Sequence, residues 1–168
     1  MASTYEPIAS QTLGTATATV SFTSIAADWT DLVVSIQARG SNTNVGNTDF
    51  DMRFNGDTGT NYSRTWLYED GVARSLRAAN QGLLTPLYPP SSQATANVFS
   101  ADLMHIFSYA NTNVYKTVLA SGSTPTSYTI RSVGLWRSTA AINSIVFIAR
   151  NTTFVSGSTF SLYGIKAA

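Results

Sequence analysis

The sequence predicts an all-β protein: an antiparallel β-sandwich, jelly-roll-like, with about eight to nine strands. Three observations carry this prediction. Short segments alternate apolar and polar residues, which is typical of half-buried strands. Thr, Ser and Asn are abundant, and these residues suit pleated surfaces and tight turns. No window keeps a helical periodicity for about three turns. An immunoglobulin-like sandwich is the second choice, although its Cys-Trp-Cys signature is absent.

Each expected strand has its own pattern. In 31–39, Leu32, Val34 and Ile36 share one face of the strand. In 49–54, Phe50 is the first of the residues expected to point inward, and Asp51 is expected to point outward. The run 98–109 is apolar at successive positions, which indicates a strand covered on both faces. The other expected strands are 16–22, 64–68, 114–120, 128–136, 142–149 and 159–165, with 4–9 as an edge strand.

Turn residues separate these strands. The segments 55–59, 121–125 and 156–158 are rich in Gly, Asn and Ser, which supply the backbone conformations that tight turns need. The segment 77–93 differs, because its three Pro residues cannot donate to a central ladder. We therefore expect a long loop there.

The loop 77–93 has two alternative roles. Its apolar side chains either plug one end of the protein's own sandwich or pack on a neighbouring subunit. In the second case, the oligomer and capsid contacts would come from this loop and from the N-terminal segment 1–15; the expected contact residues are Tyr5, Leu83, Leu84, Leu87 and Tyr88.

Length and composition limit the class of protein. The 168 residues fit a single domain spanning 1–168. Charged residues make up only 11% and the net charge is +1, which argues against nucleic acid as a partner. No apolar stretch or leader pattern indicates a membrane span or a secretion signal. Without Cys there is no disulfide framework and no thiolate metal site, and we expect no cofactor.

Few residues have the pattern of a catalytic site. The single His, His105, lies in an apolar strand, which favours a hydrogen-bonded core or interface residue over a general base. A Ser-His-Asp triad with Asp102 lacks the Gly-x-Ser-x-Gly motif. The adjacent Glu69 and Asp70 suit a turn better than a converging glycosidase pair. The sequence therefore predicts that the protein is not an enzyme.

Metal and phosphate motifs are equally weak. Asp49 and Asp51 share a strand face and would bind Ca²⁺ together with Asp57, but the following residues fail the EF-hand pattern. We favour a solvated strand face on which Arg53 balances the two aspartates. The segment 56–59 lacks the Lys of a phosphate loop and is expected to be a turn.

An aromatic stripe is the strongest candidate for a ligand face. Tyr62, Arg64, Trp66 and Tyr68 alternate along one strand and so share one side of it. Such a stripe can stack against sugars, anchor a protein interface, or simply pack in the core.

Several segments in order resemble a family of bacteriophage virion proteins, similar to those of phages of cyanobacteria and other aquatic bacteria. The segments that carry the resemblance are 5–9 (Tyr-Glu-Pro-Ile-Ala), 10–14, 29–34, 53–59, 61–63, 109–112, 115–117, 134–142 and 157–165. Together they extend over nearly the whole chain.

This resemblance implies a β-sandwich component of the phage head or tail, without catalytic residues. Because no coiled-coil, collagen-like or β-helical stalk is present, it favours a capsid cement (decoration) protein: a homotrimer that binds the major capsid protein on the outer head surface. Such a protein would be made in the cytoplasm of the host bacterium. The alternative is a tail-associated receptor- or carbohydrate-binding module, whose ligand face would be Tyr62, Trp66 and Tyr68.

Overall fold

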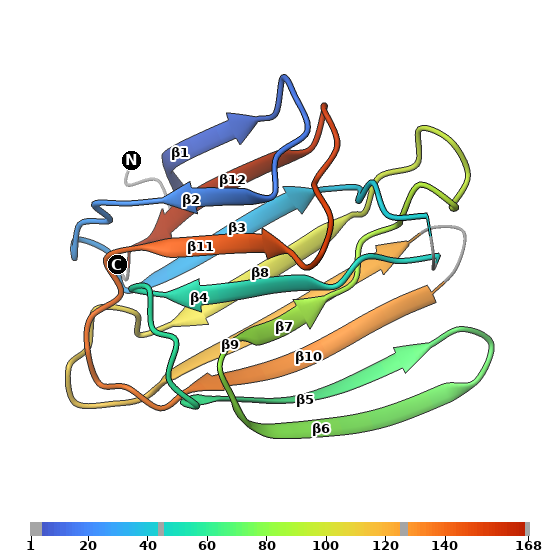
Figure 1. The fold of residues 1–168 in the computed structure, drawn as a ribbon. Coiled ribbons are helices and arrows are strands. Elements are labelled where there is room, and N and C mark those ends of the chain that lie inside the picture. The colour runs from blue at the N-terminus through green and yellow to red at the C-terminus, as the bar shows by residue number, and fades with distance from the viewer. Residues whose placement is uncertain (1–4, 44–45, 125–127, 167–168) are drawn as a thin grey trace.

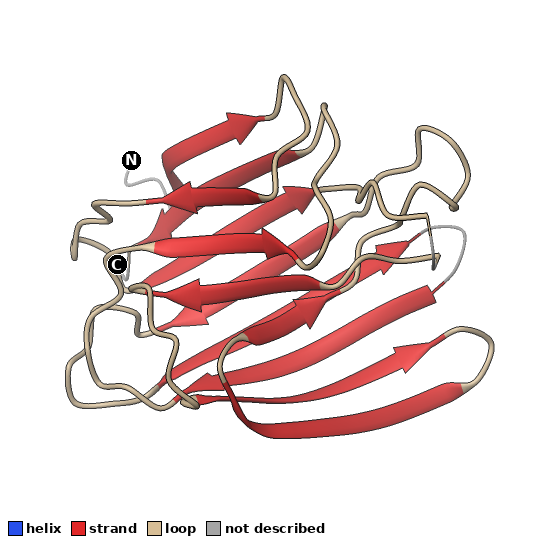
Figure 2. Cartoon of the chain, in the orientation of Figure 1, coloured by secondary structure: helices blue, strands red, loops and turns tan. Residues whose placement is uncertain are grey.

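The computed structural model describes residues 5–43, 46–124 and 128–166, and these form strands, turns and loops without a helix (Figure 2). No helix long and apolar enough to cross a membrane therefore occurs among them. The twelve strands are β1 (Tyr5–Thr12), β2 (Thr19–Phe22), β3 (Asp31–Gln37), β4 (Phe50–Phe54), β5 (Tyr62–Glu69), β6 (Ala73–Gln81), β7 (Leu84–Leu87), β8 (Asp102–Phe107), β9 (Lys116–Thr124), β10 (Tyr128–Trp136), β11 (Ile145–Ala149) and β12 (Thr159–Ile165).

The strands form two antiparallel sheets of unequal size, stacked as a jelly-roll-like sandwich (Figure 1). The large sheet has the order β1-β12-β3-β8-β9-β10-β5-β6, and the small sheet has the order β2-β11-β4-β7. Each strand order contains neighbours distant in the sequence, such as β3 beside β12 and β5 beside β10. The predicted β-sandwich is confirmed, with more strands than expected.

Aromatic rings connect the two sheets at the centre of the core. Phe50 and Phe147, both on the small sheet, lie 5.4 Å apart between ring centroids. Phe147 stacks on Phe160 of the large sheet at 5.6 Å, and Phe160 meets Phe154 edge-on at 5.2 Å. All four side chains are fully buried. Such ring pairs add roughly 0.5–1.5 kcal/mol each beyond the burial of their area.

The small sheet covers only part of the large one. Its edge strand β7 packs on β10 and β5, while β6 lies beyond it (Figure 1). The close approach of β7 depends on Gly134, because a Cβ there would lie 2.5 Å from Leu84 Cδ2. Nearly every residue of β6 is exposed, so this strand lies outside the cover that the small sheet provides.

The expected loop at 77–93 is wrong. That segment contains most of β6 and all of β7, the two strands that were not among the ranges expected from the sequence. Pro86 is tolerated because β7 is an edge strand, where a missing donor leaves no central ladder broken. The long irregular segment is 88–101 instead. It is held by Arg39, whose guanidinium donates to the carbonyls of Ser92, Ala94, Thr95 and Val98.

Other predicted boundaries hold with shifts. The strand at 128–136 and the strand at 159–165 have the predicted limits, and the expected edge strand at the N-terminus is β1. The expected turn at 121–125 is wrong up to Thr124, since β9 continues through it; Pro125 lies outside the described residues. Gly122 is needed there, because a Cβ would lie 2.2 Å from Asp102 Oδ1 on β8.

Candidate functional site

The aromatic stripe of β5 lies on the inner face of the large sheet, whereas the sequence predicted only that its side chains share one face of a strand. Tyr62, Trp66 and Tyr68 share this face with Arg64, but they differ in exposure along the strand. Tyr62 is fully buried and stacks on Trp136 at 6.4 Å, and burial raises its pKa to about 12. Trp66 is 8% exposed, and Tyr68 is half-buried. The stripe therefore begins in the core and ends at the surface.

The exposed end of this stripe lines a groove of about 280 Å³ beside the edge of the small sheet. Trp66 and Tyr68 come from β5, and Leu76 lies directly opposite Trp66 on β6. Tyr88 follows β7 and Tyr128 begins β10, so four aromatic side chains from three parts of the chain converge here. Asn47 and Asp70 complete the lining. We call this set the aromatic groove.

Two arginines fix the rings of the groove. The Arg64 guanidinium lies 4.2 Å from the centre of the Trp66 ring and donates to the carbonyl of Thr85 at 3.0 Å. Arg74 lies over the Tyr68 ring at 5.5 Å and donates to its hydroxyl at 3.1 Å. The same guanidinium pairs with the Asp70 carboxylate at 3.0 Å. These contacts hold the rings in place before any ligand arrives.

The residues predicted as subunit or capsid contacts separate into two groups. Leu84 and Leu87 are buried in the protein's own core and offer no surface to a partner. For these two residues, the alternative in which the segment plugs one end of its own sandwich therefore applies. Leu83 and Tyr88 are half-buried, and Tyr88 lines the aromatic groove. Tyr5 is 54% exposed on the edge strand β1.

The expected solvated aspartate face on β4 is wrong. Asp51 is fully buried, because Arg150 binds it through Nε and Nη2 at 2.6 Å each and the Thr85 hydroxyl donates to it at 2.6 Å. Arg150 also pairs with Asp49 at 2.9 Å. Arg53, expected to balance the aspartates, donates to the carbonyl of Gly82. This arginine cluster ties β4, β7 and the end of β11 together.

The proposed calcium ligands are not assembled. Asp57 accepts hydrogen bonds from Trp136 and Asn61, while Asp49 and Asp51 are occupied by Arg150. Among the described residues, no three His, Cys, Asp or Glu side chains lie close enough together to hold a metal ion.

His105 lies on the outer face of the large sheet, where it stacks on Phe107 at 4.0 Å. Its Nε2 lies 2.9 Å from Asp31 Oδ2, and the other oxygen of that carboxylate accepts from the backbone of Ser108. Asp102 is on the opposite face of β8, so the triad considered from the sequence is not formed. His105 is a hydrogen-bonded surface residue of the sheet.

A second candidate surface is the outer face of the large sheet, and the sequence reasoning missed it. Leu67, Leu103, Leu119 and Val133 are between 43% and 59% exposed. Leu119 lies directly opposite Val133. Leu67 and Leu103 lie two residues further along their strands on the same face, with Arg131 and Ser121 between them. We call these four side chains the outer apolar row. The signal available in the sequence was a run of apolar residues at successive positions of a strand, as in 98–109, which places apolar side chains on both faces of the sheet.

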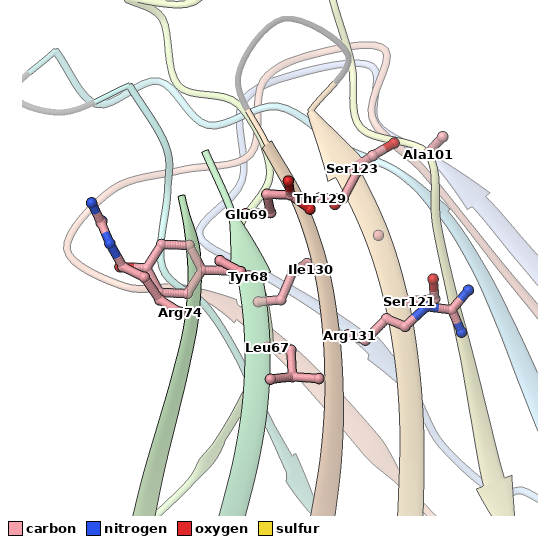
Figure 3. Close-up of a pocket in the computed structure, with 12 residues that line it drawn as sticks. Leu67, Tyr68, Glu69, Arg74, Ala101, Ser121, Ser123, Thr129, Ile130 and Arg131 are labelled. Carbon is pink, nitrogen blue, oxygen red and sulfur yellow. The ribbon is translucent and has the colours of Figure 1, made fainter. Parts of the chain in front are cut away.

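A shallow hollow of about 570 Å³ borders the outer apolar row (Figure 3). It is lined on this side by Leu67, Glu69, Ser121 and Arg131. In Figure 3 the Tyr68 ring and Arg74 lie together to one side of β5, away from Ser121 and Arg131. Tyr68 and Arg74, which belong to the inner face, also line this hollow, so it adjoins both faces of the sheet at this end of β5.

Comparison with known proteins identifies no family. The chain matches no protein-family model and no curated protein. Among solved structures it is similar to scytalido-glutamic peptidase with a transition state analog inhibitor, at 11% identity and a TM-score of 0.29. That match covers 89% of this chain and 75% of the peptidase chain, and a likeness this weak carries no argument about fold or activity.

Proposed function

We propose that this chain is a virion structural protein of a bacteriophage, a non-catalytic cement protein that binds the major capsid protein on the outer head surface as a homotrimer. The order of sequence segments that resemble phage virion proteins supports the phage assignment. The observation that supports the mode of action is the outer apolar row, because several exposed apolar side chains gathered on one sheet face favour a protein–protein contact surface.

The chemistry of this surface suits docking on a protein lattice. The row lies on a sheet face, with Arg131 as its central charged neighbour. Arginine is enriched among the residues that dominate binding energy at interfaces, and the aliphatic side chains around Arg131 add apolar area that a partner would bury. A ligand that binds only the assembled shell stabilises it by mass action.

Localisation on virions tests the biological role. We expect cryo-electron imaging or immunogold labelling to find the protein spread over the head lattice at three-fold or pseudo-three-fold positions. Label confined to the tail tip would instead indicate the tail-associated receptor-binding module.

A matched pair of variants tests the docking face. Leu67 and Leu76 lie on neighbouring strands, are 59% and 48% exposed, and point to opposite faces. We expect Leu67→Asp combined with Leu119→Asp to reduce binding to capsids that lack the protein by more than about tenfold, equivalent to roughly 1.4 kcal/mol. Leu76→Asp should bind as the wild type does. Circular dichroism establishes that all variants are folded, and undiminished binding of the double variant would exclude the outer row.

A further inference from the structure

The aromatic groove has no role in the proposed docking, because it lies on the opposite face of the large sheet from the outer apolar row. We infer that it is a carbohydrate-binding site that holds one or two neutral sugar rings of an extended glycan. The inference is independent of where the protein sits on the virion.

The aromatic lining is the first argument. Sugars present apolar C–H faces and hydroxyl edges, and aromatic side chains with polar tips match both. Tyr68, Tyr88 and Tyr128 are half-buried, so each ring packs on the protein while part of it remains open to the groove. Leu76, 48% exposed on β6, adds an aliphatic wall.

Polar groups at the rim are the second argument. Tyr128 donates its hydroxyl to the Tyr88 carbonyl, which fixes one side of the groove. Asn47 and Asp70 place an amide and a carboxylate beside the rings, and both types of group bind sugar hydroxyls. The Tyr88 phenol is protonated at neutral pH and can donate a hydrogen bond, and burial raises its pKa further.

Charge and size select the class of sugar. Asp70, the charged residue of the lining, pairs with Arg74 at 3.0 Å, so the lining offers no unpaired charge to an ionic ligand. The volume of about 280 Å³ lies just below the range of roughly 300–1,000 Å³ typical of small-molecule pockets. A short stretch of neutral glycan fits these limits better than an anionic sugar or a folded partner.

The arginine clamps supply preorganisation. Trp66 is held under Arg64, and Tyr68 is held by Arg74 through both its ring and its hydroxyl. A ligand entering the groove therefore meets rings that already have fixed positions, which lowers the ordering cost of binding.

The test uses the purified full chain on a glycan array carrying neutral hexose, N-acetylhexosamine and deoxyhexose oligosaccharides alongside sialylated ones. We expect the wild type to bind a subset of the neutral glycans. Tyr68→Ala and Leu76→Asp should each weaken that binding by about tenfold or more, since removing an aromatic or apolar contact removes the stacking surface. Leu67→Asp, on the other face, should bind as the wild type does.

Three results would overturn the inference: no glycan bound by the folded wild type, preference for the sialylated glycans, or full binding retained by both groove variants. The capsid-docking assay separates this result from the proposed function. Leu76→Asp is expected to lose sugar binding and keep docking, whereas Leu67→Asp with Leu119→Asp is expected to do the reverse.

Discussion

Trp66 and Leu67 are adjacent in the sequence, yet they belong to two surfaces with different chemistry. Trp66 faces inward, is 8% exposed and lies under an arginine. Leu67 faces outward and is 59% exposed. The inner surface is a concave groove with aromatic rings and polar groups, whereas the outer surface is a row of aliphatic side chains on a sheet face.

This difference teaches that exposed apolar area by itself does not specify a ligand. Aliphatic side chains on a sheet face offer apolar area but no directional hydrogen bonds, which suits contact with another protein surface. Rings held by arginines beside an amide and a carboxylate offer fixed directions, which suit a small polar ligand. The predictions below separate the two surfaces by perturbing one and leaving the other intact.

The largest effect is expected in the arginine cluster that joins β4, β7 and the end of β11. Asp51→Ala removes the buried partner of Arg150 and the acceptor of Thr85 on β7. We expect a loss of about 2–4 kcal/mol in the free energy of unfolding, less than for a fully buried pair because Arg150 remains partly exposed. Below the unfolding transition, sugar binding should weaken while capsid docking persists.

Chemical denaturation measures this loss of stability. Asp49→Ala is the matched control, since its carboxylate binds the same arginine but is 41% exposed, and it should cost less than about 1 kcal/mol. Equal losses for the two variants would show that burial of Asp51 does not decide the strength of the cluster.

A pH-dependent effect is expected at Asp102, on the inner face of β8. Burial raises the pKa of its carboxyl from 3.8 to about 7, and Oδ2 has no hydrogen-bond partner. Since the folded-state pKa is the higher one, this group favours folding most at low pH, and its contribution is lost as the pH rises from about 4 through 7. Asp102→Asn should therefore stabilise the protein at pH 8, by a few kcal/mol, and have little effect at pH 4.

Thermal unfolding of wild type and variant at several pH values checks this window, and taking the difference in stability removes the contributions of groups that the two proteins share. Leu103→Asn, one residue along and on the outer face, is the control and should show no such pH dependence. If the difference in stability between wild type and Asp102→Asn did not change with pH, the raised pKa of a buried carboxyl would not be the cause of the effect.

The smallest effect is expected at the rim. Arg74→Gln removes the guanidinium that holds Tyr68 and Asp70, while the side chain is 48% exposed. We expect an unchanged melting temperature and a sugar affinity weaker by about two- to threefold, because the Tyr68 ring is less well fixed. Arg77→Gln, from the outer side of the same strand, should leave both quantities unchanged.

The sequence predicted strands well where one face of the strand packs in the core and the other does not. The strands at 128–136 and 159–165 alternate buried and more exposed positions, and their limits agree with the structure. The two strands in the segment 77–93 could not be predicted in this way, because β6 is exposed on both faces and β7 is buried on both. Neither strand shows the alternation from which a half-buried strand is recognised.

The sequence predicted only part of the candidate site. The shared face of Tyr62, Trp66 and Tyr68 follows from the two-residue period of a strand, but the contributions of Leu76, Tyr88 and Tyr128 do not. Those three residues reach the groove through strand pairing and the position of β7, which are set by contacts between distant segments. The burial of Asp51 depends likewise on Arg150, ninety-nine residues away.

The sequence by itself determined the all-β class, most of the strands and the division of side chains between the two faces of each strand, because these depend on local periodicity and turn chemistry. Only the tertiary structure decided that the small sheet ends at β7, leaving an aromatic groove on one side of the large sheet and an apolar row on the other. The physical reason is that a strand pattern fixes which residues share a face, whereas the covering of that face depends on which distant strands pair and pack against it.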